Sequence, residues 1–327
     1  MIAWRAYRMP LEGIARGYLN TGFYILDALR RATEVELTAG DVTKSMHVLH
    51  VCPPQFLKPV LGRVNSLFSM WESDRIPPNE LDRFRLADRL IVPSKHNSEV
   101  LAAYGMKSSV VNLGVHPAFL QIPDREGWHA GQELAFLSLG AANQRKGTHL
   151  LLPAWKESWA KRRPSYDPFL YVKTIRDPPE VRAFCGGRAV IDTRDLDPKA
   201  LLELYARSDV FLFPSVGEGF GLPALEAMAA GCLVVSTDST GLAEFVTSEN
   251  AIVVQRSMTA TANYGVDIDV QVPTVSDLAD ALVWLYDHLG TIELESLKIA
   301  GRQTAARMTW DHTAKNLLSL FPTLFAG

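Results

Sequence analysis

Two glutamates and a run of glycines are the residues best suited to chemistry in this 327-residue chain. Glu218 stands in the loop Gly217–Gly221, and Glu226 follows with seven residues between the two carboxylates. The loop comes after an apolar run ending at Pro214, which predicts a buried strand, and Pro223 favours the first turn of a helix. A helix start behind a glycine loop can direct unpaired N–H groups at an anion. We therefore expect both carboxylates to border one cleft for a sugar or a phosphate.

This segment, Gly217–Ser236 with its continuation Thr240–Glu244, resembles the E-x7-E signature of a glycosyltransferase family. The family is that of the retaining enzymes with the GT-B fold, particularly family 4 (glycosyl transferases group 1). Further segments resemble elements of the same family: Phe136–Gly140, Arg145–Gly147, Val92–Ser94 and Asn112–Pro117. The resemblance covers residues 85–320, whereas the first 80 residues match in outline only.

The chain alternates apolar strand patterns with helical patterns, which predicts an α/β fold with parallel sheets. Its length exceeds that of a usual single core, so two domains are expected. The resemblance implies the GT-B arrangement of two Rossmann-like, doubly wound parallel-sheet domains facing across a cleft. The expected parts are residues 1–125 as an acceptor-binding domain, 132–308 as a donor-binding domain, and 309–327 as a helix returning toward the first domain.

The expected strands are Met1–Ala6, His47–Val51, Asn65–Met70, Arg89–Val92, Ser109–Asn112, Leu134–Leu139, Phe169–Lys173, Ala189–Asp192, Val210–Phe213, Leu233–Ser236 and Ile252–Val254. The expected helices include Tyr24–Thr33, Lys95–Tyr104 and Asp311–Leu320, and the basic run Lys161–Arg163 is expected to end another helix. Gln121–Gly131, which has no apolar periodicity, is the expected linker.

On the donor side, the resemblance implies a cation for the donor diphosphate at Lys146, which would balance the charge of the leaving nucleotide. The family usually pairs this lysine with an arginine, and that position here holds Ala141. Either Arg145 or Lys173 supplies the second cation, or diphosphate binding depends on backbone donors. Lys173 is a candidate because it ends an apolar strand.

The resemblance also gives roles to the two glutamates. Glu226 would bind the ribose hydroxyls of the nucleotide, since a carboxylate can accept from both. Glu218 would contact the donor sugar or help to hold the developing oxocarbenium charge. Sugar or phosphate oxygens would bind to the backbone N–H groups of Gly219, Phe220, Gly221 and Leu222. Same-face attack assisted by the departing phosphate is implied, so the two-carboxylate scheme of glycosidases does not apply.

The acceptor side carries weaker signals. The family's glycine-rich loop is present in a reduced form at Glu12–Tyr18, and a strand ends in Trp71-Glu72-Ser73-Asp74-Arg75 before two prolines. An aromatic ring can stack on a sugar or a base, and Glu72 can hydrogen-bond the acceptor hydroxyl. The alternative is a loop held by salt bridges. The expected acceptor-binding residues are Trp71, Arg16, Tyr18, Asp74 and Arg75, with Glu72 as a catalytic group beside Glu218.

Neither a metal nor a cofactor is expected. His47 and His50 point to opposite faces of a strand, and no His and Cys spacing is typical of zinc. Asp195–Asp197 and Asp267–Asp269 contain the Asp-x-Asp pattern of another glycosyltransferase fold, but we interpret both as surface loops. GT-B enzymes generally need no bound metal.

Composition predicts a cytoplasmic globular protein. The net charge is −3, 47% of the residues are hydrophobic, and no apolar run is long enough to span a membrane. The N-terminus lacks a signal-peptide pattern. Cys52, Cys185 and Cys232 lie in or beside apolar sequence, which predicts buried thiols in a reducing compartment.

The resemblance predicts a retaining glycosyltransferase that uses a nucleotide-diphosphate sugar and a saccharide or other hydroxylated acceptor. A phage-type DNA glycosyltransferase that modifies a hydroxylated base is an alternative, which a slightly basic first half allows. A nucleotide-sugar epimerase or phosphorylase is a second one, although the E-x7-E signature argues against it. A non-catalytic protein that binds nucleotide-sugars is a third, and it stays open because Ala141 replaces the family arginine.

Overall fold

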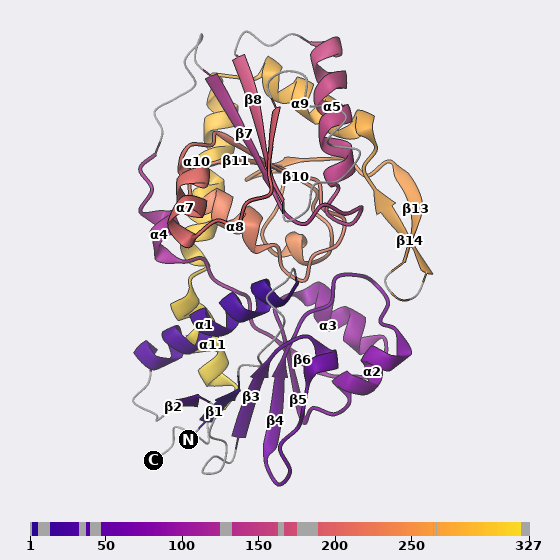
Figure 1. Ribbon diagram of the computed structural model, residues 1–327, viewed down its shortest axis with the longest axis vertical. Helices are drawn as coiled ribbons and strands as arrows, with labels where there is room; N and C mark the ends of the chain where they lie inside the picture. The colour runs from indigo at the N-terminus through magenta and orange to yellow at the C-terminus, as the bar shows by residue number, and fades with distance from the viewer. Residues whose placement is uncertain are drawn as a thin grey trace. The chain divides into compact units, whose positions relative to one another are not determined.

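The computed structural model describes residues 2–5, 14–32, 37–39, 47–124, 133–162, 167–174, 189–263, 265 and 267–321. The chain divides into two compact units, and we treat each by itself. Unit 1 comprises Met1–Gly114, Asn263–Ile268 and Met308–Gly327, and unit 2 comprises Val115–Ala262 and Asp269–Arg307. Each unit contains a six-stranded sheet with parallel pairing throughout (Figure 1).

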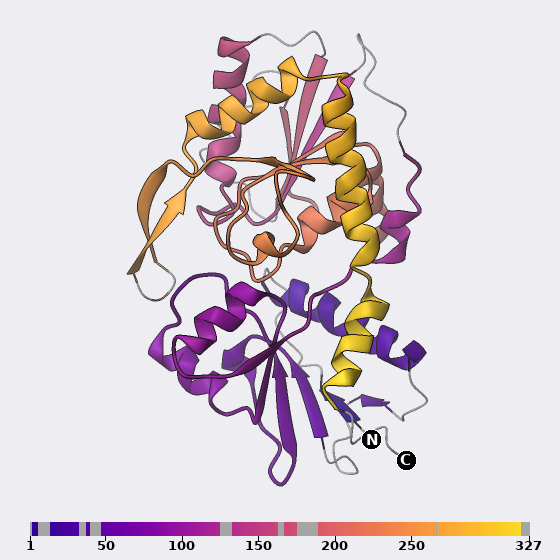
Figure 2. The same ribbon diagram turned by 180° about the vertical axis from the view of Figure 1, so that it is seen from behind.

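The sheet of unit 1 has the strand order β2-β1-β3-β4-β5-β6. Helices α1 and α11 pack against each other on one face of this sheet, and α2 and α3 lie on the other (Figures 1 and 2). The bounds are β1 Ile2–Arg5, α1 Ile14–Ala32, β2 Leu37–Ala39, β3 His47–Val51, η1 Pro54–Phe56, β4 Val64–Phe68, α2 Pro78–Phe84, β5 Arg89–Val92, α3 Lys95–Ala102, β6 Ser108–Val110 and α11 Trp310–Ser319.

The main sheet of unit 2 has the order β12-β11-β10-β7-β8-β9. Helices α5 and α9 pack together on one face, and α7, α8 and α10 cover the other (Figures 1 and 2). The bounds are α4 Pro117–Leu120, β7 Glu133–Leu139, α5 Thr148–Lys161, β8 Asp167–Lys173, β9 Ala189–Asp192, α7 Pro198–Ala206, β10 Val210–Phe213, α8 Leu222–Ala229, β11 Leu233–Ser236, η2 Thr240–Glu244, β12 Ile252–Val253, β13 Met258–Asn263, β14 Asp267–Val272, α9 Val275–Asp287 and α10 Ile292–Arg307.

Side-chain caps fix the starts of several helices. Asp197 accepts from the Ala200 N–H at the start of α7, where Pro198 occupies the first turn. Thr274 and Asp277 form a capping box at α9, in which each side chain accepts from the other residue's backbone N–H. Short polar residues before apolar periodic segments therefore set where these helices begin.

Apolar strands form the cores, as the sequence predicts. All four residues of β10 and all four of β11 are buried, because helices cover both faces of the sheet. The strands expected at His47–Val51, Arg89–Val92 and Ala189–Asp192 have those bounds in the structure. Lys161 ends α5 as expected, and its ammonium contacts Asp280 at 2.8 Å.

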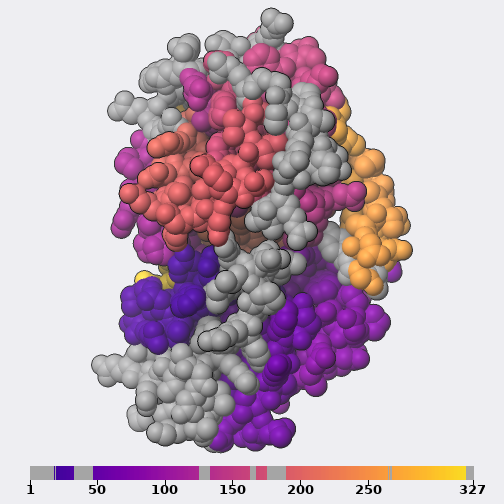
Figure 3. Space-filling model, viewed as in Figure 1, coloured from indigo at the N-terminus to yellow at the C-terminus, as the bar shows by residue number. Residues whose placement is uncertain are grey.

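Three expectations were wrong or incomplete. Helix α1 begins at Ile14, ten residues before the expected Tyr24, so the residues from Ile14 to Tyr18 are helical and not a loop. Strand β2 was not expected. The pair Asp267–Asp269 lies in strand β14 and not in a loop. With β13 this strand forms a separate two-stranded sheet, whose atoms (orange) lie at the surface in Figure 3.

Cys52 and Cys232 are buried thiols and not part of a disulfide, in agreement with the expectation, whereas Cys185 lies outside the described residues. Among the helices that the structure describes, none has the length and apolar character to cross a membrane. The first part of the expected linker, Gln121–Asp124, belongs to unit 2, and the rest of it lies outside the described residues.

Candidate functional site

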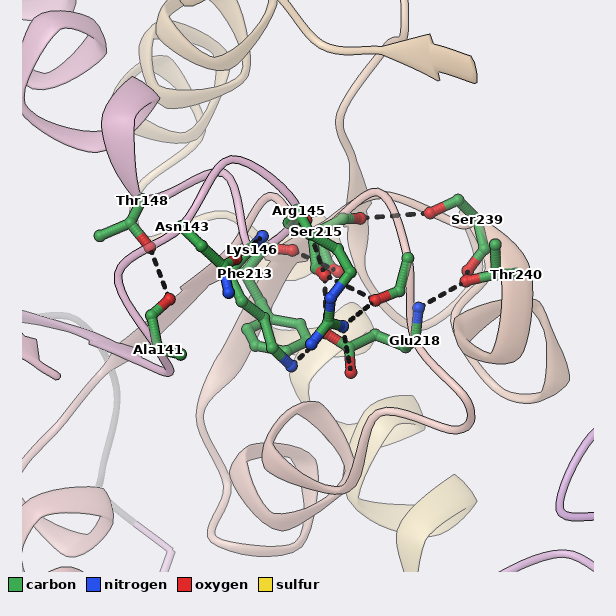
Figure 4. Close-up of polar contacts among 12 residues, drawn as sticks. Ala141, Asn143, Arg145, Lys146, Thr148, Phe213, Ser215, Glu218, Ser239 and Thr240 are labelled. Carbon is green, nitrogen blue, oxygen red and sulfur yellow. Dashed lines mark hydrogen bonds and ion pairs between the residues drawn. The ribbon is translucent and has the colours of Figure 1, made fainter. Parts of the chain in front are cut away.

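The strand order of unit 2 points to the place where a ligand should bind. Strands β7 and β10 are parallel neighbours in the sheet but are separated in sequence by β8 and β9, so successive strands are added toward one edge after β7 and toward the other edge from β10. Open parallel sheets bind ligands beside the carboxyl ends of strands at such a switch point. The loops that leave β7 and β10 carry Lys146 and Glu218, respectively. These two residues meet there (Figure 4).

The turn before α5 presents Lys146. Its N–H donates to Asn143 Oδ1 at 2.9 Å, and Gly147 follows with φ +66°. A Cβ on Gly147 would stand 2.3 Å from the Pro214 carbonyl oxygen, so the turn packs directly on the end of β10. Only glycine satisfies both the left-handed backbone and this close approach.

Glu218 is the centre of a buried polar cluster. Its Oε1 accepts from Lys146 Nζ at 2.5 Å and from Ser215 Oγ at 2.6 Å, and its Oε2 lies 3.8 Å from Arg145 Nη1. The side chain of Glu218 is 7% exposed, and those of Lys146 and Arg145 are each 14% exposed. Lys146 Nζ also lies 5.2 Å from the centre of the Phe213 ring. The cluster thus holds two cations and one anion at the switch point (Figure 4).

The charges in this cluster keep Glu218 ionised. Burial raises the pKa of the Glu218 carboxyl, but Lys146, Arg145 and the Ser215 hydroxyl outweigh that effect and hold the pKa below its usual value. An arriving anion would have to share or take over these two cations.

The loop between β10 and α8 carries donors as well. Within the part of the chain that the structure describes, the N–H groups of Gly219, Phe220 and Gly221 have no hydrogen-bond acceptor. The N–H of Leu222 opens α8, so it is one of the groups that a helix leaves without an internal partner. This arrangement suits an anion or a set of hydroxyl oxygens.

Glu226 has a different environment. It lies in α8, is half-buried, and accepts from the hydroxyl of Tyr205 in α7 at 3.0 Å. Burial raises the pKa of the Glu226 carboxyl to about 7, although the Tyr205 hydrogen bond acts in the opposite direction. Burial also raises the pKa of Tyr205 well above its usual value, so its hydroxyl remains a donor.

Lys173 stands at the end of β8. Its ammonium donates to the carbonyls of Thr174 at 3.0 Å and Asp192 at 3.3 Å, at the carboxyl ends of β8 and β9. Of the two candidates for the second cation, Arg145 is therefore the one that the structure brings beside Lys146. The carbonyl of Ala141 accepts from the Thr148 hydroxyl at 3.2 Å.

A comparison with known protein families finds a match for the donor-side segment. The family model described as glycosyl transferases group 1 matches residues 133–288, which include every donor-side residue discussed above. The match covers just under half of the chain.

Two curated relatives are similar to part of the chain. A D-inositol 3-phosphate glycosyltransferase of Corynebacterium urealyticum is 34% identical over 141 residues, which are 42% of this chain and 28% of that protein. One of Kribbella flavida is 29% identical over 258 residues, which are 72% of this chain and 57% of that protein. The chain thus spans less than two thirds of the length of either relative.

A solved structure extends the similarity to both units. The sucrose-phosphate synthase from Thermosynechococcus elongatus matches 99% of this chain and 99% of its own, with a TM-score of 0.70 and 16% identity. At that identity the match concerns the fold. It confirms the predicted GT-B fold with two Rossmann-like domains.

In unit 1, neutral side chains hold the loop that carries the expected acceptor residues. Asn97, in α3, donates to the Trp71 carbonyl at 2.8 Å and accepts from the Trp71 N–H at 2.7 Å. The hydroxyl of Tyr18, in α1, donates to the Met70 carbonyl at 3.1 Å and accepts from the Met70 N–H at 3.0 Å. Trp71 Nε1 donates to the Ser73 hydroxyl and the Arg75 carbonyl. The indole N–H is thus used inside the loop, and the ring is half-buried.

The other expected acceptor residues differ in exposure. Asp74 and Arg75 are exposed, and Asp74 Oδ1 lies 3.7 Å from His96 Nε2. Glu72 is half-buried, and its charge helps to raise the pKa of the buried Tyr18, for which burial is the main cause. Arg16 lies in α1, and its side chain is outside the described part of the structure.

Several residues of both sites were not predicted. Ser215 and Thr240 contact Glu218, Tyr205 contacts Glu226, and Asn97 holds Trp71. Ser215 directly follows the proline at the end of β10, which is a weak positional signal. Thr240 opens the segment Thr240–Glu244, which the resemblance includes without giving this residue a role. Tyr205 and Asn97 come from distant elements, so no local pattern indicates them.

Proposed function

We propose that this protein is a retaining glycosyltransferase that moves a sugar from a nucleotide-diphosphate sugar to a hydroxyl group without a metal ion. The observation that carries the proposal is the pair of cations, Lys146 and Arg145, at the switch point of a group 1 domain, beside the N-terminal end of α8. Cations and helix N–H groups are the features that a diphosphate requires.

Lys146 and Arg145 would bind the diphosphate in this proposal. Bond cleavage leaves negative charge on the nucleotide, and fixed cations in a partly buried site stabilise that charge best when they are already in place. Glu218 holds both cations in position before the donor binds. Arg145 would then serve in place of the arginine that the family has where this chain has Ala141.

Glu226 would accept hydrogen bonds from the ribose hydroxyls, and Tyr205 would fix the orientation of its carboxylate. Glu218 would contact the donor sugar or balance oxocarbenium charge, supported by the N–H groups of Gly219, Phe220 and Gly221. Attack from the same face as the leaving phosphate needs no protein nucleophile. The departing phosphate itself would assist removal of the acceptor proton.

For the acceptor we propose a saccharide or another hydroxylated molecule bound by the loop Trp71–Arg75 of unit 1. The ring of Trp71 suits stacking on a sugar, and the exposed Asp74 and Arg75 suit hydrogen bonds to hydroxyls. Glu72 would hydrogen-bond the reacting hydroxyl. The names of the two relatives specify an inositol phosphate acceptor for those proteins, and a compound of that class is a sensible first candidate.

Thermal unfolding with a panel of uridine, guanosine and other nucleotide-diphosphate sugars tests the donor side, because a ligand that binds the native state raises Tm. The matched control is Lys146→Ala, which should remove the shift. The productive donor is then incubated with acceptors, and NMR of the product should show the anomeric configuration of the donor. No shift with any donor would overturn the proposal, and an inverted product would overturn the retaining mechanism.

A further inference from the structure

Thr240 has an unusual backbone conformation. Its φ is +53°, and it is the one non-glycine residue in the described segments with positive φ. A β-branched residue in the left-handed region is strained, and such strain persists where the surrounding structure enforces it. Thr240 opens η2, the turn after β11, which packs on the glycine loop after β10.

This strained turn holds both backbone polar groups of Glu218. The Glu218 N–H donates to Thr240 Oγ1 at 2.8 Å (Figure 4). The Gly241 N–H donates to the Glu218 carbonyl at 2.9 Å. A Cβ on Gly241 would stand 2.3 Å from the Gly219 carbonyl oxygen, so the two loops are in direct backbone contact. The left-handed conformation of Thr240 thus brings a hydroxyl and an N–H to the same residue.

The same segment also fixes the residue that holds the Glu218 side chain. The hydroxyls of Thr237 and Ser239 both donate to the carbonyl of Ser215, the latter at 3.1 Å. Ser215 in turn donates to Glu218 Oε1 at 2.6 Å. Residues 237–241 therefore control Glu218 through its backbone directly and through its carboxylate by way of Ser215.

We infer that Thr240 is a positioning residue for the donor site: its hydroxyl, held by the strained turn, fixes the Glu218 backbone and so sets where the carboxylate and the neighbouring cations stand. This inference rests on the proposed function, since the position of Glu218 matters for turnover only if Glu218 contacts the donor. Strain at Thr240 is the cost of placing the hydroxyl there. Hydroxyl and strain can be separated by substitution.

Three variants separate the two properties. Thr240→Ser keeps the hydroxyl, Thr240→Val keeps the β-branched shape but removes the hydroxyl, and Thr240→Gly removes the hydroxyl and relieves the strain. Thr261→Val is the matched control, because Thr261 is an exposed threonine of β13 whose hydroxyl bonds to Asp269 on the neighbouring strand. For each variant we would measure kcat and KM for the donor, Tm, and amide hydrogen exchange of a peptide spanning residues 216–222.

We expect kcat to depend on whether residue 240 has a hydroxyl, and Tm to depend on the backbone strain at residue 240. Thr240→Ser should keep kcat within about twofold, whereas the Val and Gly variants should both lose about tenfold, since small misplacements of catalytic groups are costly. Tm should be higher for Thr240→Gly than for Thr240→Val. The inference would be overturned if the variants had the same ranking by kcat as by Tm, or if the Val variant had an unchanged kcat.

Hydrogen exchange tests the inference without any donor. The peptide should exchange faster in the Val and Gly variants than in the wild type and in Thr240→Ser, because the Glu218 N–H loses its acceptor. Equal exchange in all variants would overturn the role of Thr240 whatever the enzyme does. Absence of donor binding by the wild type would instead overturn the proposed function while this readout still tests the hydroxyl.

Discussion

Different interactions hold the loops at the carboxyl edge of each sheet. In unit 2, the loops after β7 and β10 meet through charges: Lys146 and Arg145 flank the buried carboxylate of Glu218. In unit 1, the loop after β4 is held by neutral hydrogen bonds from Tyr18 and Asn97 to the backbone of the loop. In unit 2, a charged ligand can compete for the ion pairs of the cluster. In unit 1, the loop provides a preformed surface.

The difference has energetic consequences. A neutral hydrogen bond contributes about 1 kcal/mol of net stability, and its loss does not depend strongly on pH or salt. A buried ion pair contributes little net stability, but removing one partner leaves a buried charge without compensation. The cluster in unit 2 should therefore respond strongly to substitution, to pH and to anions. The loop in unit 1 should respond mainly to changes in its own shape.

Lys146→Ala should have the largest effect. It removes the cation nearest to Glu218, and breaking a buried pair in this way costs about 3–5 kcal/mol of stability. Loss of the cation that would bind the diphosphate should weaken nucleotide-sugar affinity by about 100-fold. Isothermal titration calorimetry and thermal unfolding would be run in parallel, so that binding is measured on folded protein. Lys161→Ala is the control, because Lys161 is a lysine with ion pairs at the far end of α5.

Acid titration of the wild type and of Lys146→Ala would show whether the charge of the cluster causes this loss of stability. The lowered pKa of Glu218 adds stability above the unfolded value of 4.5, and this stability is lost as the pH falls through the folded value. The loss on acidification should be smaller in Lys146→Ala, because its Glu218 pKa is higher. Unchanged donor affinity in Lys146→Ala would return this lysine to a purely structural role.

Glu226 should make donor binding depend on pH. Its pKa of about 7 means that the ionised form, which can accept from two ribose hydroxyls, increases from pH 6 to pH 8. If the donor binds only that form, affinity should rise about tenfold over this range. The raised pKa has the opposite effect on stability, which decreases as the pH rises from the unfolded value of 4.5 through about 7. Opposite trends in affinity and Tm are therefore expected.

The control variants isolate Glu226. Glu226→Gln should bind the donor more weakly and without this pH dependence. Tyr205→Phe removes a hydrogen bond that lowers the pKa of Glu226, so the midpoint should move to higher pH. The probe should be a nucleotide-diphosphate sugar, since a terminal phosphate titrates at about pH 6 and would obscure the result. A flat profile in the wild type would remove Glu226 from the ribose site.

The contrast between the two edges also explains what the sequence could predict. Buried parallel strands such as Val210–Phe213 and Leu233–Ser236 were found because continuous apolar runs are their direct signal. The first half of α1 was missed because Gly13 and Gly17 suggested a loop, although Gly17 lies inside the helix. The β13–β14 pair was missed because its Asp-x-Asp pattern was interpreted as a surface loop, although Asp267–Val272 alternates exposed polar with less exposed apolar side chains, as a half-buried strand does.

The residues of the candidate sites also divide into those that local sequence motifs indicate and those that depend on distant contacts. Lys146 and Glu218 could be proposed because the segments that hold them resemble motifs of one family, and Arg145 was one of two candidates for the second cation. Tyr205, Asn97 and Thr240 could not, because their roles depend on which distant loop each side chain meets. The left-handed conformation of Thr240 is also invisible in the sequence, since threonine is a residue that rarely adopts it.

Glu72→Gln tests the preformed surface of unit 1. The amide keeps the shape of the side chain but cannot carry negative charge, so turnover with acceptor should fall several-fold while donor affinity stays within a few-fold. Initial rates, donor binding and Tm would be measured together. Turnover equal to that of the wild type would favour a structural role for the loop, and loss of donor affinity would assign Glu72 to the donor side.

Activity should not change when a chelator is added, which is the smallest effect that we predict. Across the described residues, no group of three His, Cys, Asp or Glu side chains could hold a metal ion. In the two Asp-x-Asp pairs, Asp197 caps α7, and Asp267 and Asp269 accept from Asn263 and Thr261 on the neighbouring strand. Catalysis in our proposal instead uses the fixed cations Lys146 and Arg145, which a chelator cannot remove. Initial rates with and without EDTA would be compared after dialysis. Loss of activity that manganese or magnesium restores would mean that a metal ion, and not the charged cluster alone, neutralises the leaving phosphate.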